Sequence, residues 1–295
     1  MSNEEKIIKY FTKNYNKIGD DCAYLSQTKQ LISSDTLVEN IHFDLKYFTP
    51  KNIAHRLFTA NYSDIQSSGG KPKYVLLNLS FPNKNFRFVN KIIKNFHRYC
   101  LKYGIEIIGG DTTASDKIFL SLTIISDAIN KNKIIKRSQA KINDKIYTFS
   151  GIGYSKLGFM NIYKNLKLPK DISALSKKQF LSPKIYTYYD LFKKIKLNSC
   201  MDVSDSLLST LRSISSQSNK KIVLNNLLNI NKKLHGYSKN DQYYNSLILS
   251  SGEEFVPVFS SPMDLLKFNN KESFKRRGIK TVSYTHLRAH ETSKH

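Results

Sequence analysis

The chain has few cysteines and no long apolar run, and each of these absences excludes a class of protein. Its three cysteines, Cys22, Cys100 and Cys200, stand far apart and leave neither a disulfide framework nor a C-x-x-C metal site. Apolar runs such as residues 75–77 are broken by polar residues well before the roughly 20 apolar residues that a membrane-spanning helix needs. Residues 1–5 lack the basic start and the apolar run of an export signal. We therefore expect a cytoplasmic protein with no membrane segment.

Acidic residues are scarce. The chain has 23 Asp+Glu against 47 Lys+Arg, which gives a formal net charge of +24. A charge of this size is typical of proteins that bind nucleic acid. The lysines, however, are scattered along the chain and are not gathered into one basic arm. We interpret the excess as compositional drift over the solvated surface of an ordinary enzyme, which makes nucleic acid the less favoured partner.

The usual nucleotide-binding signatures are also missing. The sequence has no G-x-x-x-x-G-K-[ST] loop, no G-x-S-x-G elbow and no pair of protein-kinase H-R-D and D-F-G motifs. Gly151, Gly153 and Gly158 follow a strand-like segment, but the third glycine of G-x-G-x-x-G is absent at the required position. If the protein acts on phosphate groups, we therefore expect it to use metal ions and not a lysine-bearing loop.

Strand-like and helical segments alternate, which predicts an α/β (α+β) protein and disfavours a bundle or a sandwich. Two helices are indicated by apolar residues at spacings of three and four, at residues 53–67 and 207–216. Strands are indicated by β-branched and aromatic residues at residues 31–33, 74–81, 105–108, 119–125 and 146–149. Between about residues 137 and 158 the chain passes through a turn, a strand and a glycine turn, where we expect a domain boundary.

The few acids are the most informative residues, because several stand beside glycine turns, at strand ends or at a helix start. These are Asp20, Asp21, Asp35, Asp64, Asp111, Asp202 and Asp205. Each motif alone is commonly a turn, a cap or a loop. Together they predict carboxylates that face a common cleft. Oxygen ligands without a Cys or His cluster suit Mg²⁺, and converging carboxylates repel one another unless cations lie between them.

Two of these motifs carry more specific expectations. The segment Ser33-Ser34-Asp35-Thr36 is predicted to close a strand with a row of oxygen ligands. Residues 201–205 precede the helix predicted at 207–216, where Ser204 or Asp205 can cap the helix and leave its free N–H groups facing an anion.

Five motifs, taken in order, resemble the thiamine-monophosphate kinase family. They are Gly19-Asp20-Asp21-Cys22-Ala23, the segment from Ser33 to Glu39 with His42-Phe43, Asn61-Tyr62-Ser63-Asp64-Ile65, Gly109-Gly110-Asp111-Thr112-Thr113, and the segment from Met201 to Leu208. The resemblance runs from about residue 18 to about residue 260. Aminoimidazole ribonucleotide synthetases and selenophosphate synthetases, of the same superfamily, share parts of the pattern but not the segment that leads to His42.

The resemblance implies a two-domain fold like that of aminoimidazole ribonucleotide synthetase. An N-terminal domain over residues 1–138 would bind ATP and metal, and its mixed sheet would pair in a homodimer. A C-terminal α/β domain over residues 139–282 would close the ATP cleft. Residues 283–295 match nothing in the family and are expected to form a non-native or disordered tail.

The resemblance also assigns roles to single residues. The metal-binding positions of the family are matched by Asp21, Ser33, Ser34, Asp35, Asp64, Asp111, Asp202 and Asp205. The ATP contacts are matched by Gly110, Asp111, Arg137 and Ser204, and the substrate contacts by His42 and Glu253. Taken without the ordered motifs, Arg137 would be surface charge and His42 an ordinary core histidine.

The activity that the resemblance implies is ATP-dependent phosphorylation of thiamine phosphate to thiamine diphosphate. No general base is expected, because the acceptor is itself a phosphate monoester with a second pKa of about 6. Several Mg²⁺ ions are expected to assist a direct in-line transfer without a phosphoenzyme.

Three departures from the family pattern leave alternatives open. Ser34 replaces a usual Thr, Ser206 replaces a usual Gly, and Glu253 stands among residues that differ from the family's Gly-Gly-Glu-Asp-Tyr-Glu-Leu. The first alternative is another superfamily member, an ATP-using enzyme like aminoimidazole ribonucleotide synthetase or selenophosphate synthetase. The second is a catalytically impaired, basic RNA-binding relative.

Overall fold

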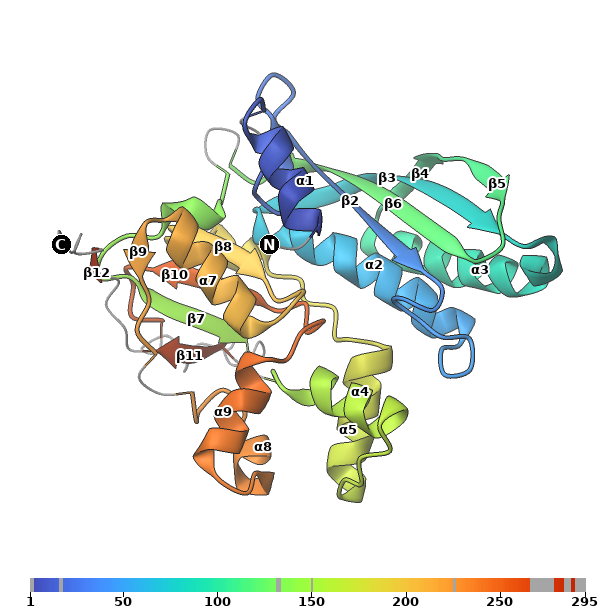
Figure 1. The fold of residues 1–295 in the computed structure, drawn as a ribbon. Coiled ribbons are helices and arrows are strands. Elements are labelled where there is room, and N and C mark those ends of the chain that lie inside the picture. The colour runs from blue at the N-terminus through green and yellow to red at the C-terminus, as the bar shows by residue number, and fades with distance from the viewer. Residues whose placement is uncertain are drawn as a thin grey trace.

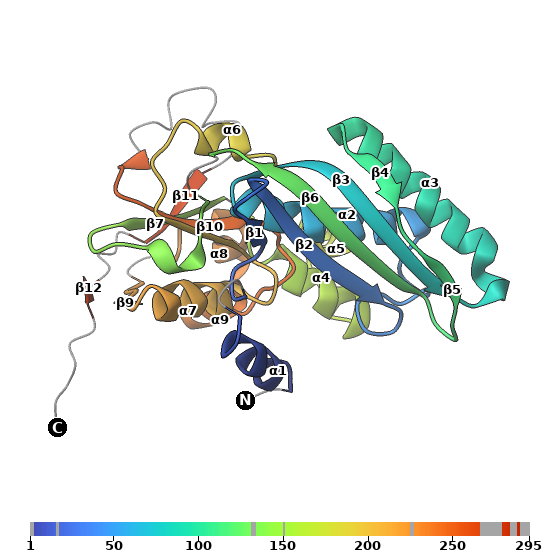
Figure 2. The ribbon, with the colours of Figure 1, turned by 90° about the horizontal axis from the view of Figure 1, so that it is seen from above.

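Two large sheets carry the fold, one in each half of the chain (Figures 1 and 2). Each half has its own hydrophobic core. The computed structural model describes residues 3–15, 18–130, 134–149, 151–224, 227–265, 279–283 and 288–289. Within these residues no helix is both long enough and apolar enough to cross a membrane.

The sheet of the N-terminal half is mixed. Its strands, in spatial order, are β1 (Ala23–Leu25), β2 (Gln30–Val38), β6 (Phe119–Ala128), β3 (Gly70–Phe81) and β4 (Glu106–Gly109), and β5 (Thr112–Ala114) also pairs with β3. β6 runs antiparallel to both β2 and β3, whereas β4 and β5 run parallel to β3.

Two long helices, α2 (Pro50–Ser67) and α3 (Phe86–Tyr103), cover one face of this sheet (Figure 1). α2 begins with a capping box, because the Thr49 hydroxyl accepts the N–H of Asn52 and the Asn52 side chain accepts the N–H of Thr49. Figure 2 shows the opposite face of β2, β6 and β3 with no described helix in front of it.

The sheet of the C-terminal half has the order β11 (Ile279–Ser283), β7 (Lys145–Phe149), β10 (Pro257–Ser261) and β8 (Ser199–Asp202), with antiparallel neighbours throughout. α7 (Leu207–Gln217) packs against β8, and α4 (Tyr154–Tyr163) packs against α5 (Lys170–Leu181). The shorter elements are α1 (Asn3–Thr12), α6 (Tyr189–Phe192), α8 (Lys232–Tyr237), α9 (Asp241–Leu249), β9 (Lys220–Lys221), β12 (Arg288–Ala289) and the 3-10 turns at Asn83–Asn85 and Arg137–Gln139.

The predicted α/β class with a mixed sheet is confirmed, and both predicted helices are present as α2 and α7. Two local expectations were wrong. Residues 33–36 do not close a strand, because β2 continues to pair with β6 as far as Val38. α7 is capped neither by Ser204 nor by Asp205, because the hydroxyl of Ser206 accepts the N–H of Ser209 at 3.1 Å.

The domain boundary predicted between residues 138 and 139 stays a prediction. The two cores divide near residue 140, but Phe180 of α5 packs with the first core. Of the tail predicted at 283–295, Ser283 ends β11 and residues 288–289 form β12. The rest of that tail lies outside the described residues.

Candidate functional site

A cleft of about 840 Å³ lies between the two halves of the chain, and most of the charged residues that line it are acids. The acidic residues that line it are Asp20, Asp21, Asp35, Asp64, Asp202, Asp205 and Glu253. Against these stand two arginines among the lining residues, Arg56 and Arg137. In a chain with a formal net charge of +24, so local an excess of acids indicates a site that receives cations.

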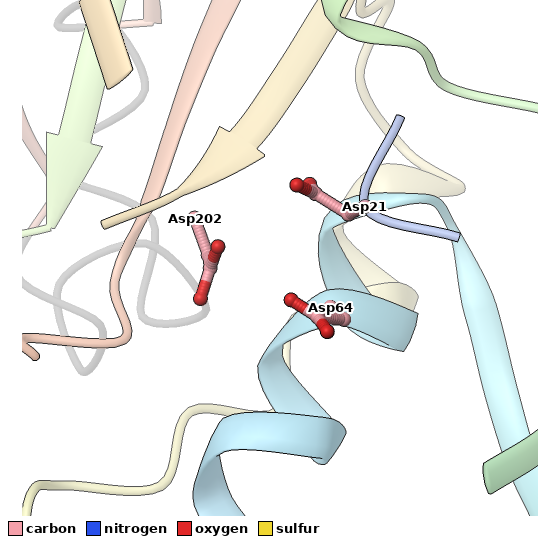
Figure 3. A group of neighbouring side chains, drawn as sticks. All are labelled: Asp21, Asp64 and Asp202. Atoms are coloured by element: carbon pink, nitrogen blue, oxygen red, sulfur yellow. The ribbon is translucent and has the colours of Figure 1, made fainter. Parts of the chain in front are cut away.

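Three carboxylates meet in this cleft, and each comes from a different part of the fold (Figure 3). Asp21 lies in the turn before β1, Asp64 in the last turn of α2, and Asp202 at the end of β8. One oxygen from each carboxylate lies within 4.8 Å of the others. The expectation that these acids converge is therefore borne out for three residues that are up to 181 positions apart in the sequence.

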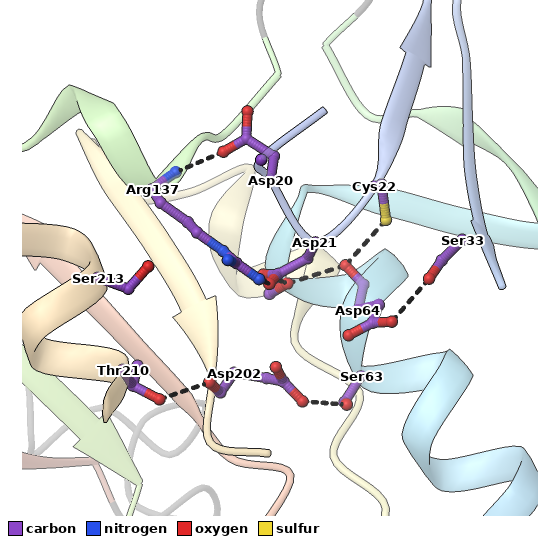
Figure 4. A network of polar contacts seen from close by, with 12 residues as sticks. Asp20, Asp21, Cys22, Ser33, Ser63, Asp64, Arg137, Asp202, Thr210 and Ser213 are labelled. Carbon is purple, nitrogen blue, oxygen red and sulfur yellow. Dashed lines mark hydrogen bonds and ion pairs between the residues drawn. The ribbon is translucent and has the colours of Figure 1, made fainter. Parts of the chain in front are cut away.

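Serine hydroxyls hold the three carboxylates in place, and Figure 4 shows those of Ser33 and Ser63. The Ser33 hydroxyl donates to Oδ2 of Asp64 at 2.6 Å. The Ser63 hydroxyl donates to Oδ2 of Asp202 at 2.5 Å, and the Ser67 hydroxyl donates to Oδ2 of Asp21. Each of these serines is buried, so its hydrogen bond fixes a carboxylate that would otherwise turn freely.

Arg137 anchors the acidic turn of the N-terminal half to the C-terminal half. Its guanidinium donates to Oδ1 of Asp21 through Nε at 3.0 Å and through Nη2, and its main-chain N–H donates to Asp20 at 2.9 Å. Arg137 was predicted to contact ATP, and it lines the cleft. Its pairing with the carboxylate of Asp21 was not predicted from the sequence.

The electrostatics of the three carboxylates favour a bound cation. Burial, with repulsion from Asp21 next in size, raises the pKa of Asp202 to about 8. The pKa of Asp64 lies well above its usual range because of burial and of repulsion by Asp202, Asp35 and Asp21. Burial also raises the pKa of Asp21, although Arg137 opposes the rise. Ionised carboxylates this close are unfavourable on their own, and an oxygen-only ligand set of this kind fits Mg²⁺.

The side chains of β2 alternate between the cleft and the outer face of the sheet, as in any strand. Ser33 and Asp35 lie on the side of α2, and the N–H of Asp35 donates to the side chain of Asn61 at 3.2 Å. The hydroxyl of Ser34 pairs instead with that of Thr123 at 3.0 Å on the outer face. Ser34 is nevertheless among the residues that line the cleft, and its metal role stays a prediction.

The other predicted contacts on this side of the fold line the same cleft. They are Ser204, Asp205, His42 and Glu253. Nδ1 of His42 accepts the N–H of Val38 at 3.0 Å. Glu253 forms an ion pair with Arg56 of α2.

Gly110 and Asp111 are not among the described residues that line this cleft. They form the turn between β4 and β5, where the N–H of Leu79 donates to the carbonyl of Asp111 at 2.8 Å. A Cβ on Gly110 would lie 1.9 Å from the carbonyl oxygen of Leu77. The close packing of this turn on β3 therefore explains the glycine without a ligand, and the metal and ATP roles of the two residues stay predictions.

Sequence reasoning missed three residues that hold the site together: Arg56, Ser63 and Ser67. Ser63 and Ser67 lie one residue before and three residues after Asp64 on α2, so helical spacing alone would have placed Ser67 beside it. Arg56 lies across the helix from the apolar residues at 54, 57, 58, 61 and 65, so helical spacing predicts an exposed side chain, whereas the side chain is buried.

Comparisons with known proteins identify the family of the chain. The family model described as AIR synthase related protein, N-terminal domain, matches residues 19–127. A thiamine-monophosphate kinase of Buchnera aphidicola from Schizaphis graminum is 33% identical, with 98% of this chain and 92% of the relative covered. One of Leptospira interrogans is 32% identical, with 90% of this chain and 85% of the relative covered. The chain belongs to the thiamine-monophosphate kinase family.

Solved structures show the same fold. The crystal structure of thiamine monophosphate kinase from Aquifex aeolicus aligns with a TM-score of 0.76, at 22% identity, over 98% of this chain and 95% of that one. A structure described as AaThiL complexed with AMPPCP and TMP aligns with a TM-score of 0.77, at 22% identity, over 98% of this chain and 93% of that one. These alignments confirm the family fold that the five motifs implied.

Proposed function

We propose that the chain transfers the γ-phosphoryl group of ATP to thiamine phosphate and so forms thiamine diphosphate and ADP. Membership of the thiamine-monophosphate kinase family supports the reaction, as does the complex of a structural neighbour with AMPPCP and TMP. The observation that carries the proposal is the meeting of Asp21, Asp64 and Asp202 in one cleft, because this reaction brings two phosphate anions together.

The carboxylates have the role of holding Mg²⁺. Asp21, Asp64 and Asp202 would bind it, with Asp35 and Asp205 lining the same cleft. Mg²⁺ bound there would neutralise charge on the phosphate groups of donor and acceptor. Arg137 and the serines at positions 33, 63 and 67 keep the carboxylates oriented toward one another before any ligand binds.

The transfer we propose is direct and in line. An oxygen of the acceptor phosphate attacks the γ-phosphorus, the bond from that phosphorus to the bridging oxygen breaks, and ADP leaves. The attacking oxygen is already anionic at neutral pH, so no side chain has to remove a proton. A covalent phosphoprotein formed during turnover would contradict this step.

The acceptor end of the cleft is proposed to lie near His42 and Glu253. These two residues also line an adjoining pocket of about 320 Å³, whose other walls include Phe159, Tyr163 and Phe180. Aromatic faces next to a carboxylate suit a ring with a permanent positive charge, such as a thiazolium. This match supports the predicted substrate contacts of His42 and Glu253.

An assay of ADP formation tests the proposal. With ATP and Mg²⁺, we expect ADP to form when thiamine phosphate is added and to stop when EDTA removes the metal. An aminoimidazole ribonucleotide precursor and selenide serve as control acceptors, and the Asp64→Asn variant as a control preparation. ADP formation with either control acceptor, and none with thiamine phosphate, would contradict the proposed substrate.

A further inference from the structure

A buried arginine lies where the acidic cleft meets the aromatic pocket. Arg56 of α2 lines the cleft, and its side chain is 1% exposed. The carbon at the centre of its guanidinium lies 5.2 Å from the ring centre of Phe48 and 5.0 Å from that of Phe180. A cation in this position has lost most of its hydration, so its remaining contacts have to compensate for that loss.

Each end of the guanidinium has a different partner. Nη2 donates to the main-chain carbonyl of Phe180 in α5, and Nη1 donates to Oε1 of Glu253. Nε is buried and has no hydrogen-bond partner. Over the described part of the chain, Glu253 is the one carboxylate in an ion pair with Arg56. The charge of Arg56 is therefore matched by a residue that belongs to the other half of the molecule.

The main chain of Glu253 is held as firmly as its carboxylate. Its φ is +53°, a left-handed conformation that is uncommon for a residue other than glycine. Its N–H donates to the carbonyl of Ser204, and a Cβ on Gly252 would lie 1.9 Å from the carbonyl oxygen of Asp205. A non-glycine residue in this conformation is retained only where its surroundings fix it, and such positions cluster at functional sites.

One oxygen of the Glu253 carboxylate remains available. The side chain is 37% exposed, and no hydrogen bond to Oε2 comes from any residue that the structure describes. Glu253 lines both the cleft and the aromatic pocket. With Oε1 fixed by Arg56 and the main chain fixed by Ser204, Oε2 is held at the junction of the two cavities.

We propose that Arg56 is a positioning residue for the phosphate acceptor, which acts by holding the carboxylate of Glu253 against the cationic ring of that substrate. The proposal rests on the proposed function, in which Glu253 contacts thiamine phosphate. In this proposal Arg56 acts through Glu253 and not on a reacting phosphate. Its loss should therefore weaken acceptor binding and leave nucleotide binding intact.

Two substitutions separate the geometry of Arg56 from its charge. Arg56→Lys keeps the charge but cannot reach Glu253 and the Phe180 carbonyl together, because Lys lacks the planar fork. Arg56→Met removes the charge and keeps much of the side-chain volume. In both variants we expect the KM for thiamine phosphate to rise at least tenfold, with the KM for ATP and kcat changed less than threefold. Such a split is the signature of lost acceptor binding.

The matched control is His55, the neighbouring residue on α2. Its Nε2 pairs with the main-chain carbonyl of Pro183 and its Nδ1 with the hydroxyl of Tyr99, so it also ties α2 to the segment after α5. It does not line the cleft or the aromatic pocket. We expect His55→Ala to lower the melting temperature and to leave the KM for thiamine phosphate unchanged.

A double-mutant cycle decides whether Arg56 acts through Glu253. If it does, adding Arg56→Met to Glu253→Gln should raise the KM for thiamine phosphate less than twofold further. The inference is overturned if the two substitutions raise the KM for thiamine phosphate multiplicatively. It is also overturned if Arg56→Met raises the KM for ATP as much as the KM for thiamine phosphate. In either case, wild-type turnover of thiamine phosphate would still support the proposed function. Absence of wild-type turnover on thiamine phosphate overturns both.

Discussion

At the scale of single residues, the proposed metal site depends on carboxylates that would repel one another without a bound cation. Asp64 shows this most strongly, because its pKa is raised by burial and by three neighbouring aspartates. Removing its charge should therefore cost the metal-free fold little, while it removes a ligand from the metal-bound form.

Asp64→Asn tests this directly. We expect the melting temperature without metal to stay within about 2 °C of wild type or to rise, and the increase on adding Mg²⁺ to disappear. Turnover should fall at least 100-fold. Asp116→Asn is the control, because Asp116 is an exposed acid that does not line the cleft. A normal Mg²⁺-dependent increase in Asp64→Asn would remove this carboxylate from the metal site.

The types of the site residues could be predicted from the sequence, but their partners could not. Asp21, Asp64 and Asp202 were found because acids are rare in this chain and stand beside turns. The hydrogen bonds of Ser63 and Ser67 depend on how α2 faces β8 and the turn before β1, which no local pattern records. The pairing of Arg56 with Glu253 spans 197 positions and is equally invisible.

At the scale of elements, α4 has an unusual start. Its N-cap, Gly153, supplies no side-chain hydrogen bond. The carboxylate of Glu254 takes that role from a distant part of the chain, because its Oε1 accepts the N–H groups of Gly153 at 2.7 Å and of Ser155 at 3.1 Å. Gln179 of α5 donates to the second oxygen at 3.1 Å, so one buried carboxylate joins α4 and α5.

Glu254 should make stability depend on pH. Burial raises its pKa from 4.5 to about 7, so the folded state holds a proton that the unfolded state has released. Its contribution to stability is complete below about pH 4.5 and is lost as the pH rises through about 7. Each pKa unit of this shift corresponds to about 1.4 kcal/mol.

The Glu254→Gln variant checks the sign of this effect. The free energy of unfolding of wild type, minus that of the variant, should fall as the pH rises from 5 to 8, because glutamine does not titrate. Urea unfolding at four pH values measures the difference. A difference that stays constant, or that grows with pH, would show that the folded state does not bind the extra proton.

Helices whose apolar residues recur at spacings of three and four could be predicted from the sequence. The ends of strands, which depend on pairing with a neighbouring strand, could not. α2 and α7 follow from apolar spacing, whereas the length of β2 is set by its pairing with β6 up to Val38. That length matters for the site, because it places residues 33–36 within a strand. Alternation then sends Ser33 toward Asp64 and Ser34 toward Thr123.

At the scale of the whole molecule, one face of the N-terminal sheet has α2 and α3 on it, and the other has no described helix over it (Figures 1 and 2). That outer face includes Ser34, Thr36, Ser121 and Thr123, joined by hydroxyl pairs at 3.0 and 2.9 Å. We propose it as the face through which two copies of the chain pair, in keeping with the homodimer that the resemblance implied.

A charge placed on this face should prevent pairing. We expect Ser121→Arg to be a monomer by light scattering under conditions where wild type is a dimer, with an unfolding transition retained. Ser216→Arg carries the same substitution on the exposed side of α7 and should remain a dimer. Equal association of both variants would place the interface elsewhere.

The central claim is that the carboxylates of Asp21, Asp64 and Asp202 hold divalent cations next to the two phosphates. The most direct measurement is anomalous diffraction from crystals grown with Mn²⁺, AMPPCP and thiamine phosphate. The account predicts an anomalous peak among the oxygens of these three side chains, with phosphate oxygens completing its coordination. No peak between the three carboxylates, with both ligands bound, would contradict it.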